Sequence, residues 1–419
     1  MTDIALKAPA GTILTDEQVR TAFHEGLAGR FAGRRVLVLI PDATRSVPLP
    51  QVFRHVTAAM RDAASLTFVS ALGTHAPLSD EELLSLVGAS DTGLPAGVSI
   101  RNHEWYDPDT LVSIGTLSRS TIRRLAGERW HETLGGDVDV LINRAVLEHD
   151  DILILGPTFP HEVVGFSGGA KYLFPGISGQ DMINVTHWLG ALAGVRRTIG
   201  IKDTPVRAMI HAATELVPTP VTLAALVVEQ GELSGVFIGD HISAWEQAAD
   251  LSAERHIVWV DKPFRRILSV APPMYSDLWT AGKAMYKLEP ALAEGGELII
   301  HAPHLSEVSV VHGEQIKAIG YHVLPYFLEQ WDRFRDVPLG ILAHSTHVRG
   351  DGRFENGVEL PRAAVTLSSR MSQAETEEIA LSWRDPADIA PSEFMNREDD
   401  GILYVPKAGE ILYRVREKA

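Results

Sequence analysis

Cysteine is absent from this chain of 419 residues. A disulfide framework is therefore impossible, and so is a metal site built from thiolates. Any transition metal would have to be held by histidines, by carboxylates or by a cofactor that brings its own ligands. The length favours two domains, because a single domain typically contains about 100–200 residues.

Positive charge is also scarce. Lys and Arg together number 38 against 54 Asp and Glu, which gives a formal net charge of −16 at pH 7. A nucleic-acid partner is disfavoured, because its phosphates require a basic face on the protein. A small anionic substrate remains compatible with this charge, since a binding site needs only local positive charge.

Long apolar segments are missing as well. No run approaches the roughly 18 apolar residues that a membrane-spanning helix requires, and Met1 to Gly11 lack the charged-then-apolar pattern of a secretion signal. We therefore expect a cytoplasmic protein without a membrane partner. Its 45% hydrophobic and 22% charged residues are typical of a globular protein.

Short apolar runs alternate along the chain with longer amphipathic stretches. Strands are expected at residues 35–40, 65–71, 138–142, 152–155, 266–270, 297–301, 340–343, 363–367 and 402–405. Helices are expected at 79–87, 181–192 and 277–293, and a helix followed by a strand at 243–259. This alternation predicts an α/β fold in which two α/β domains contain largely parallel sheets. We place the domain boundary near Pro263.

Three polar turns follow three of these expected strands. They are Asp42-Ala43-Thr44-Arg45, Gly73-Thr74-His75 and Gly156 to Pro160. Ligands of parallel sheets bind beyond the carboxyl ends of strands, so these turns are candidate site loops. Exposed backbone N–H groups beside Arg45 would suit an anion. Equally, the first turn could be a capped turn with an incidental arginine, and His75 a hydrogen-bonded turn residue.

The segment from His161 to His187 is unusually rich in glycine. Five glycines lie between residues 165 and 179, and close approach of the backbone to a ligand is the usual reason for such a density. A P-loop is excluded, because Ala170 stands where that motif requires glycine and Tyr172 where it requires Ser or Thr. Lys171 in this setting can have a lowered pKa and act as a nucleophile. The alternative is a glycine-rich connection with two incidental histidines.

Two further histidine pairs have a spacing of three residues. They are His301 with His304, and His344 with His347. Neither pair has an obvious third ligand nearby, so we expect turns at strand ends rather than metal sites.

In chain order, these segments resemble the nickel-dependent lactate racemase family. The resemblance rests on Asp42 to Arg45, Gly73 to His75, His161 with Ser167 to Lys171, and Pro175-Gly176 through to His187. It extends over nearly the whole chain, including the stretch from His347 to Pro386. The spacing of ten residues from His161 to Lys171, and of sixteen from there to His187, matches the family pattern.

The resemblance implies a nickel(II) pyridinium-3,5-bisthiocarboxylic acid mononucleotide (nickel-pincer nucleotide) as cofactor. Lys171 would hold it covalently through a thioamide, and His187 would be the protein's nickel ligand. Asp42, Ala43, Thr44 and Arg45 would meet the cofactor phosphate and the substrate. His75 and His161 would be acid/base residues on either side of the substrate. Enzymes that synthesise the cofactor are implied as partners.

The implied reaction inverts C2 of a 2-hydroxy acid by reversible hydride transfer through a 2-keto acid. A proton is hard to remove from C2 beside a carboxylate, whereas a hydride can leave if a base takes the hydroxyl proton. Two bases are needed because the hydroxyl groups of the two enantiomers point to different sides, and histidine titrates near neutrality. Residues 1–263 would form the cofactor-binding and catalytic domain and residues 264–419 a substrate-closing domain, with the active site in the cleft between them.

The second half supplies the remaining substrate contacts that the resemblance implies. Lys283 would bind the substrate carboxylate together with Arg45. Thr280 stands where the family has Gln, and this departure predicts a pocket for a 2-hydroxy acid larger than lactate, such as a sugar acid epimerised at C2. The stretch between His75 and His161 is also longer than expected, so an added loop is predicted to shape the entrance.

Two other functions remain open from the residues alone. One is a phosphotransferase or nucleotide-binding enzyme that uses the loop from Gly165 to Lys171. The other is a non-catalytic protein that binds the cofactor.

Overall fold

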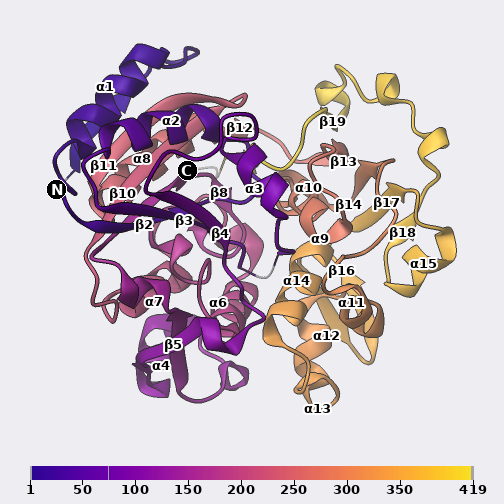
Figure 1. The fold of residues 1–419 in the computed structure, drawn as a ribbon. Coiled ribbons are helices and arrows are strands. Elements are labelled where there is room, and N and C mark those ends of the chain that lie inside the picture. Colours follow the sequence, from indigo (N-terminus) through magenta and orange to yellow (C-terminus); the bar gives the residue numbers. More distant parts are fainter. Residues whose placement is uncertain (1, 74, 417–419) are drawn as a thin grey trace.

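A seven-stranded sheet forms the centre of the first half of the molecule (Figure 1). The computed structural model describes residues 2–73 and 75–416. The strand order is β1 (Thr2–Lys7), β11 (Glu232–Asp240), β10 (Val221–Glu229), β7 (Asp151–Pro157), β2 (Arg35–Ile40), β3 (Ser65–Ser70) and β4 (Val98–Asn102). The strands from β10 to β4 run parallel, whereas β11 pairs antiparallel with β10 and β1.

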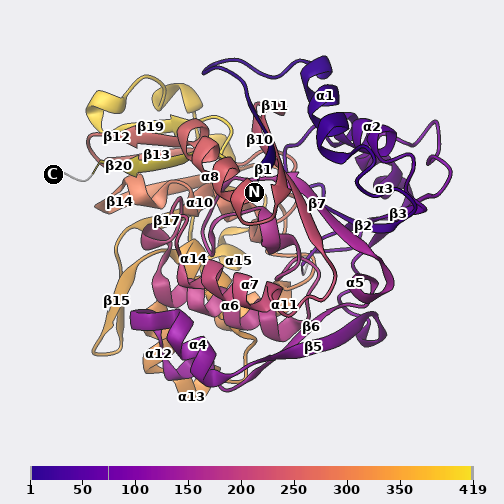
Figure 2. The same cartoon turned by 90° about the vertical axis from the view of Figure 1, so that its left-hand side faces the viewer.

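The central strands are apolar on both faces because helices cover both sides of the sheet (Figure 2). Val36 and Val38 of β2 pack in one cluster with α1 (Asp16–Leu27) and α2 (Leu49–Ala59). The alternate residues Leu37 and Leu39 pack in a second cluster with α6 (Gln180–Ala193), α7 (Pro205–Thr214) and α8 (Ser243–His256). Alternate side chains of one strand therefore serve two cores.

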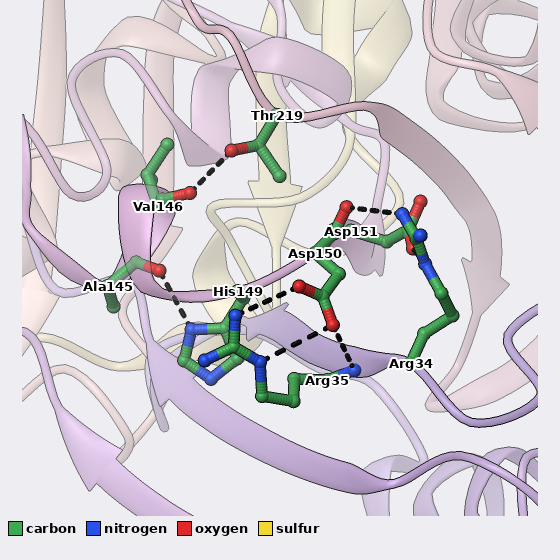
Figure 3. Close-up of polar contacts among 8 residues, drawn as sticks. All are labelled: Arg34, Arg35, Ala145, Val146, His149, Asp150, Asp151 and Thr219. Atoms are coloured by element: carbon green, nitrogen blue, oxygen red, sulfur yellow. Dashed lines mark hydrogen bonds and ion pairs between the residues drawn. The ribbon is translucent and has the colours of Figure 1, made fainter.

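At the amino ends of β2 and β7, ion pairs join the two neighbouring strands (Figure 3). The guanidinium of Arg34 lies 2.7 Å from the carboxylate of Asp151, and that of Arg35 lies 2.9 Å from the carboxylate of Asp150. Asp150 also accepts the backbone N–H of Arg35. These contacts mark the start of both strands at the protein surface.

A five-stranded sheet forms the second half. Its order is β18 (Ser382–Trp383), β17 (Ala364–Ser369), β14 (Leu292–Ala302), β13 (Phe264–Val270) and β19 (Ile402–Val405). All of its pairings are parallel. The predicted α/β class with mostly parallel sheets is confirmed.

The chain crosses between the halves at two places. Strand β12 (Ile257–Val260), which follows α8, pairs parallel with β20 (Leu412–Val415) near the chain end. The two large sheets use residues 2–240 and 264–405. The boundary at Pro263 stays a prediction. Strand β20, from the end of the chain, pairs with β12, which precedes Pro263 in the sequence.

The remaining elements connect these layers. They are α3 (Asp80–Leu86), β5 (Leu111–Leu117), α4 (Arg119–Ala126), β6 (Val138–Asn143), α5 (Ala145–Glu148), β8 (Pro160–His161), β9 (Gly165–Phe166), α9 (Leu278–Ala281), α10 (Lys283–Tyr286), α11 (Gly313–Ile319), α12 (Leu324–Glu329), α13 (Trp331–Phe334), α14 (Leu339–Arg349), β15 (Gly352–Glu355), β16 (Val358–Pro361) and α15 (Gln373–Glu378). No helix within the described ranges combines the length and apolarity needed to cross a bilayer.

Several expected elements differ from the structure. The strand predicted at 340–343 is wrong, because these residues lie in α14, a buried helix whose short apolar run has no visible helical period. The strand at 138–142 exists as β6, but it pairs antiparallel with β5 outside the main sheet. The helix expected at 277–293 divides into α9 and α10, and β14 already begins at Leu292.

Other expectations are confirmed at the level of single residues. Helix α3 begins with the predicted capping box, in which Ser79 and Glu82 bond each other's backbone N–H groups. Helices α6 and α8 cover the predicted ranges to within a few residues.

Candidate active site

The three predicted loops meet at one edge of the seven-stranded sheet. Strands β7, β2 and β3 are parallel neighbours, so the loops at their carboxyl ends lie side by side. One cavity at this edge is lined by eight of the predicted residues, namely Asp42, Arg45, His75, His161, Lys171, His187, Thr280 and Lys283. Thr74 lies outside the described residues, and Ala43 is exposed and does not line the cavity.

Asp42 orients His75 at the edge of the cavity. Its carboxylate accepts hydrogen bonds from the backbone N–H (3.0 Å) and the hydroxyl (2.7 Å) of Thr44, and its other oxygen bonds Nδ1 of His75. Burial alone would raise the pKa of Asp42, but the combined effect of His75, Arg45 and Lys283 is larger and lowers it. The carboxyl group is therefore ionised. A carboxylate can only accept, so Nδ1 of His75 is the donor of this hydrogen bond, and Nε2 is the nitrogen that can exchange a proton with a ligand.

His161 has the opposite hydrogen-bonding arrangement. Its side chain is buried, and its Nδ1 accepts the backbone N–H of Val163 at 3.2 Å. Burial, reinforced by the charges of Lys171 and Arg45, holds the pKa of His161 well below its usual range. The neutral ring therefore holds its proton on Nε2 and donates where His75 accepts.

Lys171 lies among other cations in the cavity. Burial and the charge of Arg45 lower its pKa to about 8, which leaves a substantial fraction of free amine near neutral pH. Lys283 and Lys287 are buried nearby, and the carboxylates of Asp42, Glu162 and Glu410 partly offset these charges. This region is locally positive in an acidic protein and suits an anionic ligand.

The glycines of this segment are required mainly by contacts within the protein. A Cβ on Gly165 would lie 1.8 Å from the carbonyl oxygen of Ile201, and one on Gly176 would lie 2.4 Å from that of Tyr172. Gly168 and Gly169 both have positive φ, at 77° and 58°. The predicted close approach to a ligand therefore applies at most to Gly168 and Gly176, which line the cavity.

His187 has the hydrogen-bonding arrangement that metal-binding histidines commonly have. On α6, its Nδ1 donates to the carbonyl oxygen of Ile183 at 2.8 Å, which leaves Nε2 as the free nitrogen. Burial, together with the charge of Lys171, lowers its pKa to about 4, so the ring is neutral. Within the described ranges, no group of three or more His, Asp or Glu side chains is placed to hold a metal. One imidazole, a reactive amine and surrounding cations fit an anionic cofactor that brings its own metal ligands.

The second half contributes Lys283 and Thr280 to the cavity. Nζ of Lys283 lies 3.5 Å from the hydroxyl of Thr44 and 4.8 Å from the ring centre of Tyr275. Burial and the charge of Arg45 lower the pKa of Lys283 to about 7. The hydroxyl of Thr280 donates to Asp277 at 2.7 Å, so it is already engaged within the protein.

Several lining residues were not predicted from the sequence. They are Glu162, Trp279, Tyr286, His344 and His347. The expected turns at the last two histidines are wrong, because both are buried in α14; the ring of Trp279 stacks on His344 with 3.8 Å between ring centres. Their spacing of three residues was the available signal, and it places them on one face once α14 is recognised as a helix.

The other histidine pair lies outside the cavity. Nδ1 of His301 bonds the hydroxyl of Ser368 at 3.2 Å, and Nε2 of His304 bonds the carbonyl oxygen of Tyr275 at 3.0 Å. These hydrogen bonds agree with the expected structural role.

Comparison with known proteins identifies relatives of this chain. Residues 19–128 and 131–200 match the lactate racemase N-terminal domain. The lactate racemase of Lactiplantibacillus plantarum is 25% identical over 274 residues, which are 64% of this chain and 59% of that protein. The lactate racemase of Thermoanaerobacterium thermosaccharolyticum is 24% identical over 277 residues, which are 64% and 60% of the two chains. The matched part thus spans about 60% of the length of these relatives.

Two solved structures share the fold over the full chain. A crystal structure of a protein from Thermotoga maritima is 29% identical with a TM-score of 0.88, and covers 98% of this chain and 100% of its own. The lactate racemase apoprotein from T. thermosaccharolyticum is 17% identical with a TM-score of 0.70, and covers 99% and 100%. The second likeness is one of fold alone.

Proposed function

We propose that this chain, whose residues 19–128 and 131–200 match the lactate racemase N-terminal domain, belongs to the lactate racemase family. It would invert C2 of a 2-hydroxy acid with a nickel-pincer nucleotide bound at Lys171 and His187. One observation carries this proposal. Two imidazoles with opposite hydrogen-bonding arrangements, a lysine of lowered pKa and an oriented third imidazole line a single cavity. A carrier protein would need the lysine but not the two differently oriented imidazoles.

Arg45 and Lys283 bind the substrate carboxylate. They come from opposite halves of the chain and both line the cavity. Burial by itself lowers the pKa of Arg45, but Asp42 raises it above its ordinary value, so this guanidinium stays charged. A pair of cations that line one cavity can orient a carboxylate by charge-assisted hydrogen bonds.

His75 and His161 exchange the hydroxyl proton. For one enantiomer, Nε2 of His75 accepts the proton of the C2 hydroxyl, and Asp42 stabilises the imidazolium that forms. Nε2–H of His161 returns a proton to oxygen when the opposite configuration forms, and the two roles exchange in the reverse direction. When bound, the cofactor supplies the acceptor for the C2 hydrogen as hydride.

Lys171 and His187 would hold the cofactor. The amine of Lys171 would be its covalent attachment point, and the free Nε2 of His187 would be a ligand for its metal. Cofactor-synthesis enzymes would be the partners that supply this group.

The substrate we propose is larger than lactate. Thr280 is short and its hydroxyl is engaged by Asp277, so space remains beside the carboxylate site. The stacked rings of Trp279 and His344 provide a flat wall for a longer C2 substituent.

The test is a panel of 2-hydroxy acids with protein co-expressed with cofactor-synthesis enzymes. Inversion at C2, measured by chiral chromatography, should occur with nickel-loaded protein and be lost in both H75A and H161A. Turnover unaffected by both substitutions would refute the mechanism. Tight magnesium-dependent binding of ATP without nickel would favour the phosphotransferase, which the buried Tyr172 disfavours.

A further inference from the structure

Side chains from two helices hold three consecutive carbonyl groups of the glycine-rich loop. Nη2 of Arg207 on α7 donates to the carbonyl oxygen of Phe166, and its Nη1 donates to that of Gly168 at 3.3 Å. Nε1 of Trp245 on α8 donates to the carbonyl oxygen of Ser167 at 2.9 Å. We call Arg207 and Trp245 the carbonyl clamp.

The two members of the carbonyl clamp also contact each other. The guanidinium of Arg207 lies 4.0 Å from the ring centre of Trp245, a cation–π distance. Gly169 lies against the same indole, because a Cβ at this position would come within 3.0 Å of it. Loop, guanidinium and indole therefore form one packed unit.

The burial of Arg207 is expected to destabilise the folded protein. It is 3% exposed, and burial lowers its pKa to about 9 with no carboxylate among the causes. Within the described ranges, its ion is compensated by loop carbonyls and an aromatic face rather than by a counter-charge. A buried cation without a paired anion is destabilising, so its presence calls for a function.

The position of the loop in the chain indicates what that function is. Lys171 follows Gly168 by three residues, and Thr204 at the start of α7 holds the carbonyl of Val164 at 3.2 Å. The buried side chains of Thr204, Arg207 and Trp245 thus donate to four backbone carbonyls between residues 164 and 168. The orientation of this stretch determines where the Lys171 amine lies.

We propose that Arg207 and Trp245 are positioning residues for Lys171, which fix the glycine-rich loop and make its amine reactive toward an acyl group. The proposal rests on the proposed function only for the identity of that acyl group. The charge of Arg207 acts in the same direction as burial and Arg45, since all three lower the pKa of Lys171. Both clamp residues lie beyond residue 200, where the matched N-terminal domain ends.

The experiment measures the reactivity of Lys171 in protein without cofactor. N-acetoxysuccinimide is the probe: the amine attacks its ester carbonyl, N-hydroxysuccinimide leaves, an amide forms and one proton passes to solvent. Acetylation of Lys171 is followed by peptide mass spectrometry across a pH series. Exposed Lys317 in the same sample is the internal standard.

Arg207→Met should raise the midpoint of the Lys171 pH profile by about one unit and slow its acetylation about tenfold below that midpoint. Arg207→Lys, which restores the charge, should keep the midpoint while lowering the rate. Trp245→Phe removes the donor to Ser167 but keeps a ring, and should slow Lys171 several-fold at an unchanged midpoint. The Lys317 profile should be the same in every variant.

Arg362→Met is the matched control. Arg362 also donates to two buried carbonyls, those of Leu292 and Glu289, but in the second half. It should lower the Tm without moving the Lys171 profile. The proposal is wrong if folded Arg207→Met keeps the wild-type midpoint, or if Arg362→Met shifts it equally.

If Arg207→Met does not fold, Trp245→Phe decides, and a wild-type rate at Lys171 overturns the proposal. Failure of the racemase hypothesis would appear separately, as absence of C2 inversion in loaded protein with the clamp effect on acetylation intact.

Discussion

The two ends of strands β2 and β7 use charge in opposite ways. At the amino ends, Arg34 and Arg35 each pair with a carboxylate at the surface, and every charge of this group has a partner (Figure 3). Beyond the carboxyl ends, Arg45, Lys171 and Lys283 line one cavity together with the carboxylates Asp42 and Glu162. Exposed pairs contribute little to stability, whereas buried charges of one sign shift each other's pKa. The charges at the amino ends of these strands thus pair with each other, whereas those beyond the carboxyl ends line the cavity.

The largest effect is expected at Lys171. K171A should abolish the covalent cofactor adduct and reduce C2 inversion to background, because it removes the amine that we propose as the attachment point. Intact mass spectrometry of co-expressed protein measures the adduct. K202A is the control, because Lys202 is paired with Asp250 at 2.6 Å outside the cavity; adduct retained by K171A would contradict the assignment.

The next largest effect is expected at Asp42, and it compares the carboxyl ends of the strands with their amino ends. D42N should lower kcat about a thousandfold, because the amide no longer enforces the proton on Nδ1 of His75. Racemisation assays on folded protein measure this loss. D150N removes a carboxylate from the amino end of the same sheet and should leave kcat unchanged. Equal losses in both variants would mean that the two ends do not differ in function.

A smaller effect is expected from the titration of Lys283. Its pKa is lowered to about 7, chiefly by burial and then by Arg45, so the amine is a cation below this pH and neutral above it. KM for a 2-hydroxy acid should therefore rise above pH 7, by at most about tenfold per unit. In K283R the guanidinium stays protonated, and the profile of KM against pH should become flat. A pH-dependent KM that persists in K283R would exclude Lys283 as its cause.

The smallest effect is expected at the amino end itself. Hydrogen bonding to Arg35 lowers the pKa of Asp150 to about 2, so the pair is present above that pH and weakens as the pH falls through it. R35A should produce a slight fall in Tm at neutral pH, measured by calorimetry, with unchanged C2 inversion. A large loss of activity in R35A would show that the amino end influences the site.

The predictability of the site differed between the halves. In the first half, the turns with Asp42 and His75 directly follow apolar strands, so both could be assigned to one sheet edge from the sequence. In the second half, the cavity wall comes from α14, whose residues are buried on nearly all sides. A helix of this kind lacks the polar face that produces a visible period, so His344 and His347 were misplaced.

Other features could not be predicted because they depend on contacts distant in sequence. Arg207 and Trp245 meet the loop 39 and 78 residues away from their partners at Gly168 and Ser167. No local pattern distinguishes such residues from ordinary helix positions. The opposite arrangements of His75 and His161 likewise depend on which backbone or carboxylate group folding brings to Nδ1.

The pairing of β12 with β20 has a mechanical consequence. Because the chain crosses between the halves at residues 261–263 and again at 406–411, any motion that separates them must bend at both crossings together. Such a motion would also have to part α14 from α6, where the backbone N–H of Gly340 donates to the side chain of Asn184 at 3.0 Å. Since His187 lies on α6 and His344 on α14, the two crossings and this helix pair together hold the two walls of the cavity in register.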